Sequence, residues 1–492
     1  MTDFICAIDQ GTTGTTVMIL DDTLRVRARV TEEFEQIFPK PSWVEHDPEA
    51  IWASTESTLA RAQQKAGIGP GDISAVGITN QRETTVVWDR ATGEPIHNAI
   101  VWQDRRTKGR IQQLVDNGRE PLVRERTGLI LDPYFAGSKV EWILDRVDGA
   151  RRRARDGELA FGTIDSYLVW KLTGGDVHVT DVSNASRTLF MDLNKVQWDD
   201  EMLEIFGVPR PMLPEIVGNS EVYGEVHGIE GLADGTPICG MAGDQQAALF
   251  GQICFSPGEA KCTYGTGAFL LMNTGDEVVP SEHRLLSTAA WQIDDEMTYA
   301  LEGSVFIAGA MVQWLRDGLE IIDDAAEIET LARQVDSSDG VVAVPSLSGL
   351  GAPHWKPDAR GVLWGMTRGT TRAHIARAAL EGIALQNVDV LSAMERDFGE
   401  PMKLMRADGG ASANDLLMQM QADFLDREIV RPKVTETTAL GSALLAGLGV
   451  GVFKDLDEIR STWREDRRFQ PDMSEETRSR HLKLWNQGLS RV

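Results

Sequence analysis

The sequence predicts an α/β protein of two domains. Its 492 residues exceed what one ordinary hydrophobic core accommodates. A run of strand-forming residues breaks into a small Gly/Thr loop twice, at residues 9–14 and again at residues 264–267. After each loop, predicted helices and strands alternate as they do in an α/β layer. We therefore place one domain in residues 1–251 and the other in residues 252–492, with a hinge between them.

The first half begins with a strand, a turn at the Gly/Thr loop and two further strands. Asp47, Pro48 and Glu49 then supply an N-cap, a first-turn proline and a first-turn acid, which predicts a helix that ends near Lys65. Another apolar run predicts a buried strand after this helix. The predicted elements are strands at residues 4–8, 16–20 and 26–34, the helix to about residue 65, and a strand at 73–79.

The second half repeats the strand, loop and strand before its helices begin. A second glycine-rich turn, Asp408-Gly409-Gly410, follows a later strand. The predicted elements are strands at residues 259–263 and 269–272, helices at 305–317 and 373–396, a strand at 403–406, a helix at 414–424, a strand at 428–431 and a helix at 440–448.

Composition excludes several classes of function. A net charge of -26 argues against a nucleic-acid surface, because phosphate contacts need clustered Lys and Arg. No apolar run approaches the roughly 20 residues of a membrane-spanning helix, and the N-terminus lacks the pattern of an export signal. The four cysteines show no metal-binding spacing, so we expect reduced thiols and a cytoplasmic protein.

The two Gly/Thr loops are suited to bind phosphate. Glycine lets backbone N–H groups approach an anion, and threonine adds hydroxyl donors. The commoner phosphate loops are missing, since the chain has no Gly-x-x-x-x-Gly-Lys followed by Ser or Thr and no complete G-x-G-x-x-G. A hairpin turn would use similar residues. With Asp408-Gly409-Gly410 behind them, however, the two loops predict a nucleotide held between the domains.

Candidate acceptor-binding residues follow the predicted strand at 73–79. Arg82 and Glu83 come directly after it, at the strand end where open α/β sheets bind ligands. Guanidinium donors beside a carboxylate acceptor suit a ligand with several hydroxyls. The alternative is a surface ion pair of little consequence.

Asp244 is the candidate general base. It is the one carboxylate among small or uncharged residues at 241–248, where an acid is costly unless it is paired or functional. It would accept the proton of a substrate hydroxyl as that oxygen attacks the γ-phosphate. Asp244 could instead cap the helix that follows, or do both.

Longer segments resemble the FGGY family of carbohydrate kinases, and within it the members that phosphorylate glycerol. The matching segments are residues 34–41, 43–48, 77–85, 98–103, 132–135, 243–252 and 349–353. The resemblance implies two ribonuclease-H-like domains, as in actin, hexokinase and the heat-shock ATPases, with the active site in the cleft between them. It further implies ATP-dependent conversion of glycerol to sn-glycerol 3-phosphate with Mg²⁺, and a homo-oligomer, either dimer or tetramer.

The resemblance also assigns roles to matching residues. The residues that would form hydrogen bonds with glycerol are Arg82, Glu83, Tyr134, Asp244 and Gln245. Those that would pack on its carbon atoms are Trp102 and Phe269. Without the resemblance, a Trp or Phe is more often part of the hydrophobic core. For the nucleotide they are phosphate contacts from Thr12, Thr13, Gly14, Thr16 and Thr266, and adenosine contacts from Gly309, Gln313, Gly410 and Asn414. Asp9 and Asp244 would act on Mg²⁺.

Two departures from the family pattern stand out. Many of the glycerol-phosphorylating members carry Arg where this chain has Thr16, so the first loop lacks a positive charge. In addition, members inhibited by fructose 1,6-bisphosphate use a loop bearing Gly and Arg, whereas residues 231–237 here hold no Arg and one Asp. An acidic loop repels a bisphosphate, so we expect no inhibition by that sugar.

Two other functions stay open at this point. The Arg82–Glu83 pair would also serve a kinase of another polyol or of a ketose. An actin-like or chaperone-like ATPase would use the nucleotide loops alone and would give Arg82, Glu83 and Asp244 no shared task.

Overall fold

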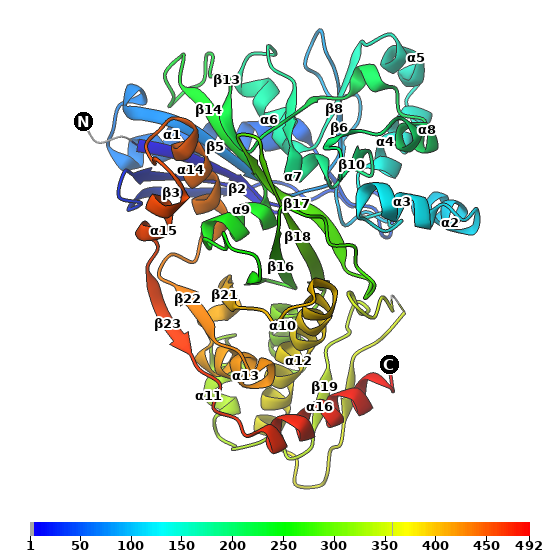
Figure 1. Ribbon diagram of the computed structural model, residues 1–492, viewed down its shortest axis with the longest axis vertical. Coiled ribbons are helices and arrows are strands. Elements are labelled where there is room, and N and C mark those ends of the chain that lie inside the picture. Colours follow the sequence, from blue (N-terminus) through cyan, green and yellow to red (C-terminus); the bar gives the residue numbers. More distant parts are fainter. Residues whose placement is uncertain (1–3, 357) are drawn as a thin grey trace.

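The computed structural model describes residues 4–356 and 358–492 as two lobes, each built on one mixed sheet (Figure 1). The first sheet has the order β13-β14-β5-β1-β2-β3. β1, β2 and β3 form an antiparallel meander, and β5 and β14 run parallel to β1. The strands are β1 (Phe4–Gln10), β2 (Gly14–Asp21), β3 (Val26–Glu33), β5 (Ile73–Asn80), β13 (Ser220–Glu225) and β14 (Pro237–Gly243).

The second sheet repeats this plan in the order β17-β18-β16-β15-β21-β22-β23. β15 and β16 correspond to β1 and β2, and β21 runs parallel to β15 as β5 does to β1. The strands are β15 (Glu259–Tyr264), β16 (Ala268–Gly275), β17 (Leu286–Ile293), β18 (Glu296–Val305), β21 (Leu404–Asp408), β22 (Ile429–Pro432) and β23 (Glu465–Phe469). The predicted fold of two similar α/β domains is therefore confirmed.

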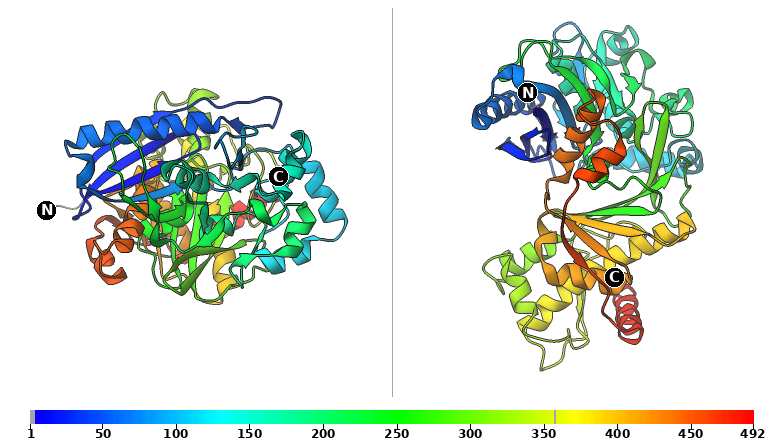
Figure 2. Two further views of the ribbon diagram at one scale, coloured as in Figure 1. Left: turned by 90° about the horizontal axis from the view of Figure 1, so that it is seen from above. Right: turned by 60° about the vertical axis from the view of Figure 1, so that its left-hand side comes forward.

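Helices cover the outer face of each sheet (Figure 2). On the first sheet, α1 (Pro48–Ala66) begins where the sequence predicts, because the Asp47 side chain accepts a hydrogen bond from the Glu49 N–H at 3.0 Å. On the second sheet the longest helix is α12 (Arg372–Phe398). The other helices of the second lobe are α10 (Gly309–Asp317), α11 (Glu327–Ala332), α13 (Asp415–Leu425) and the C-terminal α16 (Glu475–Leu489), and its minor strands are β19 (Val342–Val344) and β20 (Val362–Trp364).

Two further helices lie in the layer between the sheets. These are α9 (Asp244–Gly251), which follows β14, and α14 (Thr437–Gly449), which packs on β1, β5 and β14 although it comes from the second half of the chain. They cross so closely that a Cβ added to Gly441 would lie 1.8 Å from the Ala247 carbonyl oxygen. Glycine at this crossing lets the chain return to the first lobe, after which α15 (Leu456–Thr462) leads to β23.

A long insertion after β5 extends the first lobe. Its apolar core, around Phe135, Phe161 and Phe190, also includes Leu286 and Ala289 of β17, so the insertion packs against the second sheet. Its elements, with the short strand before it, are β4 (Glu45–His46), β6 (Val86–Asp89), β7 (Ala99–Ile100), α2 (Lys108–Asp116), α3 (Glu120–Thr127), α4 (Gly137–Arg146), α5 (Ala150–Arg155), β8 (Leu159–Gly162), α6 (Ile164–Leu172), β9 (Val179–Asp181), α7 (Val182–Ala185), β10 (Met191–Asp192), β11 (Gln197–Trp198), α8 (Asp200–Phe206) and β12 (Glu215–Val217).

One predicted helix begins later than the sequence suggests. The helix expected from residue 305 starts at Gly309, because β18 continues to Val305 and pairs with β16 to its end.

The four cysteines are free and buried. Among the described residues, no helix is both long and apolar enough to cross a membrane.

Candidate active site

Both Gly/Thr loops are tight turns between the first two strands of a sheet. In the first loop the Gly11 N–H donates to the Gly14 carbonyl at 3.0 Å, and in the second the Gly265 N–H donates to the Gly267 carbonyl at 2.8 Å. Thr13 and Thr266 are exposed at the two tips. Each loop is thus free to present backbone and hydroxyl donors to an anion.

The second loop is anchored to the start of α10. The Thr266 carbonyl accepts hydrogen bonds from the N–H groups of Ala308 at 2.8 Å and Ala310 at 3.0 Å, and the Gly265 carbonyl accepts one from Gly309 at 3.0 Å. These bonds satisfy first-turn donors of the helix. They bring Thr266 beside Gly309, and Gln313 is exposed one turn further along α10.

The Gly409-Gly410 turn packs against the same loop. Gly409 has a φ of +82°, and a Cβ there would lie 2.5 Å from the Tyr264 carbonyl oxygen, so only glycine fits. Asn414 follows and caps α13, since its side-chain oxygen accepts a hydrogen bond from the Leu417 N–H at 2.9 Å. A cavity of about 560 Å³ is lined by Gly409, Gly410, Arg431 and Lys433 of the second half of the chain and by Arg29 of the first lobe.

Arg82 is the centre of a buried polar cluster. Its guanidinium donates two hydrogen bonds to the Glu302 carboxylate, at 2.5 and 3.0 Å, and one to the Tyr134 hydroxyl at 3.3 Å. Its Nε lies 3.3 Å from Asp244 Oδ1. Arg82 and Glu83 are only 2% and 1% exposed, so the alternative of a surface ion pair is wrong.

Glu83 shares this cluster through Arg187. The Arg187 guanidinium donates to Glu83 at 2.7 Å and to Glu302 at 2.9 Å, which joins two arginines and two glutamates in one buried network. Burial raises the pKa of Glu83, against the effect of Arg82 and Arg187. Burial also acts to raise the pKa of Glu302, but Arg187 and Arg82 outweigh it and lower that pKa to about 2. Glu83 has a φ of +61°, a strained backbone of the kind that recurs at functional sites.

Aromatic side chains form a wall beside the cluster. The Trp102 ring meets Tyr134 edge-on with centroids 5.7 Å apart, and Phe269 of β16 at 6.5 Å. Trp102 and Phe269 are half-buried and therefore not plain core. The Trp102 indole N–H donates to the Thr12 hydroxyl at 2.9 Å, which links the wall to the first phosphate loop.

Asp244 and Gln245 open α9 at the same place. Asp244 Oδ1 accepts a hydrogen bond from the Gln245 N–H at 2.7 Å, and the Gln245 side chain accepts one from the Lys261 ammonium. Burial raises the pKa of Asp244, although Arg82 and Lys261 oppose it. Asp9 at the end of β1 has its pKa raised to about 7 by burial and by the charge of Asp244, with Arg29 opposing. A raised pKa suits a general base that works near neutral pH.

Asp9 and Asp244 also suit a magnesium ion. Mg²⁺ prefers oxygen ligands and is commonly held by one or two carboxylates together with substrate phosphates. Two mutually repelling carboxylates beside a phosphate loop match that requirement. No group of three or more His, Cys, Asp or Glu among the described residues could hold a metal, so phosphate oxygens would have to complete the site.

Comparison with known proteins agrees with this geometry. Residues 4–251 match the N-terminal domain, and residues 260–450 the C-terminal domain, of the FGGY family of carbohydrate kinases. The chain belongs to the FGGY family. It is 57% identical over 491 residues to a glycerol kinase of Myxococcus xanthus, covering 99% of each chain.

Solved FGGY structures share the whole architecture. The crystal structure of Plasmodium falciparum glycerol kinase with ADP superposes with a TM-score of 0.94 at 38% identity, covering 100% of this chain and 98% of that one. Gluconate kinase from Lactobacillus acidophilus reaches a TM-score of 0.90 at 23% identity, covering 100% and 98%. The second likeness concerns the fold alone, so the FGGY fold does not by itself select the acceptor.

Several charged residues of this FGGY site were missed in the sequence. Glu302 and Arg187 complete the buried network, and Lys261 binds Gln245. Lys139 donates to the backbone carbonyls of Tyr134 and Phe135, and burial lowers its pKa to about 7. The sequence neighbours of these charged residues do not reveal which distant partner each of them binds.

Thr16 lies on the cleft side of the first sheet. It pairs with Asp9 of β1 and with Thr31 of β3, and its hydroxyl bonds that of Thr31 at 2.9 Å. The position where many glycerol-phosphorylating family members carry Arg is thus beside the metal candidate but uncharged.

Proposed function

We infer that this chain is an ATP-dependent glycerol kinase, which transfers the γ-phosphoryl group of ATP to a terminal hydroxyl of glycerol and yields sn-glycerol 3-phosphate. The observation that carries this inference is the buried Arg82–Glu83 pair with the partly exposed Asp244 beside it, walled by Trp102 and close to the first phosphate loop. Relatives named glycerol kinase that match the full chain support it.

We propose the following roles at the acceptor. Arg82 and Tyr134 donate hydrogen bonds to glycerol oxygens, Glu83 and Asp244 accept them, and Gln245 can do both. Trp102 and Phe269 pack on the carbon atoms and keep water from the γ-phosphate. The buried network holds Arg82 and Glu83 in place before glycerol binds, so little reorganisation accompanies binding.

Asp244 acts as the general base in this proposal. As the glycerol oxygen attacks the γ-phosphorus, the Asp244 carboxylate takes the hydroxyl proton, the bond from phosphorus to the β,γ-bridging oxygen breaks, and ADP leaves. Asp9 and Asp244 would hold Mg²⁺, which neutralises phosphate charge when it is bound. Raised pKa values place both carboxyl groups closer to neutral pH than ordinary aspartates.

The nucleotide lies between the lobes in this proposal. The first loop contributes Thr12, Thr13 and Gly14 to the phosphates, with Thr16 beside them, and the second contributes Thr266. The adenosine would contact residues at the start of α10 and after β21, namely Gly309, Gln313, Gly410 and Asn414.

An acceptor panel tests the function. Glycerol, dihydroxyacetone, xylulose and gluconate are offered at equal concentration with Mg²⁺-ATP, and each phosphorylated product is measured. We expect glycerol to give the highest kcat/KM. Preference for xylulose or gluconate would instead establish the ketose or sugar-acid alternative, and ATP hydrolysis without any phosphorylated acceptor would establish the actin-like ATPase.

We also propose a cytoplasmic homo-oligomer, either dimer or tetramer. Four free cysteines suit a reducing compartment.

The loop at 231–237 bears on inhibition by fructose 1,6-bisphosphate. Asp234 is exposed in this loop, so we still predict that the bisphosphate does not inhibit the enzyme. Inhibition at millimolar concentration in low salt would contradict it.

A further inference from the structure

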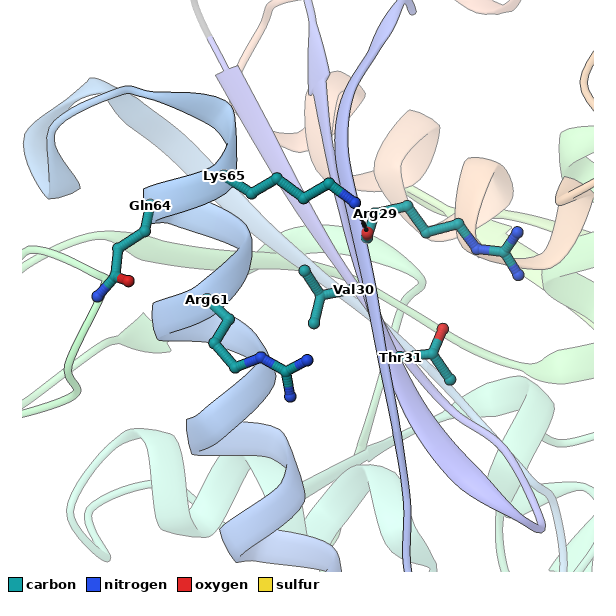
Figure 3. Close-up of a pocket in the computed structure, with 6 residues that line it drawn as sticks. All are labelled: Arg29, Val30, Thr31, Arg61, Gln64 and Lys65. Atoms are coloured by element: carbon teal, nitrogen blue, oxygen red, sulfur yellow. Dashed lines mark hydrogen bonds between the residues drawn. The ribbon is translucent and has the colours of Figure 1, made fainter.

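Strand register places Arg29 on the cleft face of the first sheet. Thr16 pairs with Thr31, and Met18 pairs with Arg29, so Arg29 lies diagonally across from Thr16 on the same face. Diagonal neighbours on a sheet are about 7–8 Å apart, within reach of an arginine side chain. Figure 3 shows Arg29 and Thr31 extending to one side of β3, while Val30 points to the other side, toward α1.

The Arg29 side chain also faces the second lobe. It lines the cavity of about 560 Å³ that Gly409 and Gly410 also line. The segment after β21 is the one assigned to adenosine, so Arg29 and the adenosine segment share one space. Arg29 therefore lies where a nucleotide would run from the second lobe toward the first phosphate loop.

Three cations line this cavity, namely Arg29, Arg431 and Lys433, and Arg29 is the one among them that the first lobe supplies. Arg431 is already paired with Asp415 at 3.0 Å and with Asp466 at 2.8 Å. The groups of the first loop and of Thr16 are neutral, while Asp9 and Asp244 are acidic and near each other. Arg29 is the cation that opposes their effect on the pKa of Asp9. An incoming triphosphate adds further negative charge, which an arginine can bind with two parallel hydrogen bonds.

The present partner of Arg29 is easily exchanged. Arg29 donates to Glu436 at 2.7 Å, but the two side chains are 51% and 37% exposed. Ion pairs in such exposed positions contribute little to stability. Glu436 directly precedes α14, so exchange of this partner requires no change in the buried layer between the sheets.

We propose that Arg29 binds the phosphate groups of the nucleotide and exchanges Glu436 for phosphate oxygens when ATP or ADP enters. This rests on the proposed nucleotide site. Arg29 thereby supplies, from β3, the positive charge that Thr16 does not supply from β2.

The test is nucleotide binding by Arg29→Gln, measured by titration calorimetry with ADP and separately with adenosine. The matched control is Arg27→Gln, which removes the same charge from the same strand, where Arg27 lies 3.7 Å from Asp21 and does not line the cavity. We expect ADP affinity to fall about 10-fold in Arg29→Gln, with adenosine affinity and the Arg27→Gln variant at the wild-type value.

Two further variants locate the charge. Thr16→Arg added to Arg29→Gln should restore ADP affinity, because the diagonal position reaches the same space. Glu436→Gln should raise ADP affinity, since Arg29 then loses its competing partner.

Unchanged ADP affinity in Arg29→Gln, or an equal loss for adenosine, overturns the proposal. Wild-type protein that binds no ADP at all would instead overturn the nucleotide site itself. The two failures are therefore distinguishable.

Discussion

The acceptor end and the nucleotide end of the proposed active site consist of different kinds of residue. The acceptor end is a buried cluster of arginines and glutamates that draws residues from both lobes. The nucleotide end consists of glycine turns and threonine hydroxyls at loop tips, and the arginine that the first lobe adds to it, Arg29, is half exposed. Charge is thus buried and fixed where we propose that the small neutral acceptor binds, and is partly carried by exposed side chains where we propose that the nucleotide binds.

The difference indicates what each end must do. Glycerol brings no charge, so in the proposed site its hydroxyls would be oriented by donors and acceptors already held in place. The nucleotide brings its own charge and Mg²⁺, so backbone and hydroxyl donors suffice for much of its binding. The features that cost folding free energy therefore lie at the acceptor end. They are the buried charges of the network and the positive φ of Glu83.

The largest effect should come from the acceptor end, at Asp244. Asp244→Asn keeps the shape but removes the base, so kcat should fall about 10²–10⁴-fold while glycerol still binds. Steady-state kinetics together with glycerol titration measure both. The control is Asp295→Asn in the exposed turn between β17 and β18. Turnover near the wild-type value would remove Asp244 from the base role.

Breaking the buried network should cost stability. Glu302→Gln leaves Arg82 and Arg187 without a full counter-charge, and loss of one member of a buried ion cluster costs about 3–5 kcal/mol. Urea unfolding measures the loss, with Glu296→Gln at the exposed end of the same strand as the control. If both variants unfold at the same urea concentration, the buried network at the acceptor end does not stabilise the fold.

At the nucleotide end, the raised pKa of Asp9 should make the stability of the fold depend on pH. The folded state raises the pKa of Asp9 from 3.8 to about 7, so its stabilising effect is complete below about pH 4 and is lost as pH rises through about 7. Asp9→Asn should therefore be more stable than the wild type at pH 8 without Mg²⁺, by on the order of 4 kcal/mol, yet less active.

Thermal unfolding from pH 4 to pH 8 checks this expectation. The gap between Asp9→Asn and the wild type should widen as pH rises. A gap that stays constant with pH would show that Asp9 does not carry the effect.

The smallest effect should come from the link between the two ends. Trp102→Phe keeps an aromatic wall but loses the indole hydrogen bond to Thr12, which is worth about 1 kcal/mol. We expect KM for glycerol to rise about 3–10-fold, with a smaller change in KM for ATP. An equal change in both would mean that Trp102 serves the nucleotide as much as the acceptor.

The sequence predicted the elements whose signals are local. The cap at Asp47 and the turn glycines placed α1 and both loops, and the order of elements predicted two similar domains. It could not predict that α14 returns to the first sheet, because small residues such as Gly441 reveal a close crossing only when the partner helix is known.

The candidate site divides in the same way. Arg82, Glu83 and Asp244 stood out because they follow strands in motif-like segments, and the structure brings them together. Glu302 and Arg187 were missed because a buried network depends on partners more than 100 residues apart along the chain. The sequence shows that Thr16 carries no charge, but only the register of β2 and β3 shows that Arg29 lies diagonally across from it.

Glycerol-dependent release of ADP by the wild-type protein tests the central claim most directly. With Mg²⁺-ATP and glycerol, we predict ADP and glycerol 3-phosphate in a one-to-one ratio, and ADP release at least about 100-fold slower without glycerol, because the attacking oxygen belongs to the acceptor. ADP release at the same rate with and without glycerol, and no glycerol 3-phosphate, would contradict the account.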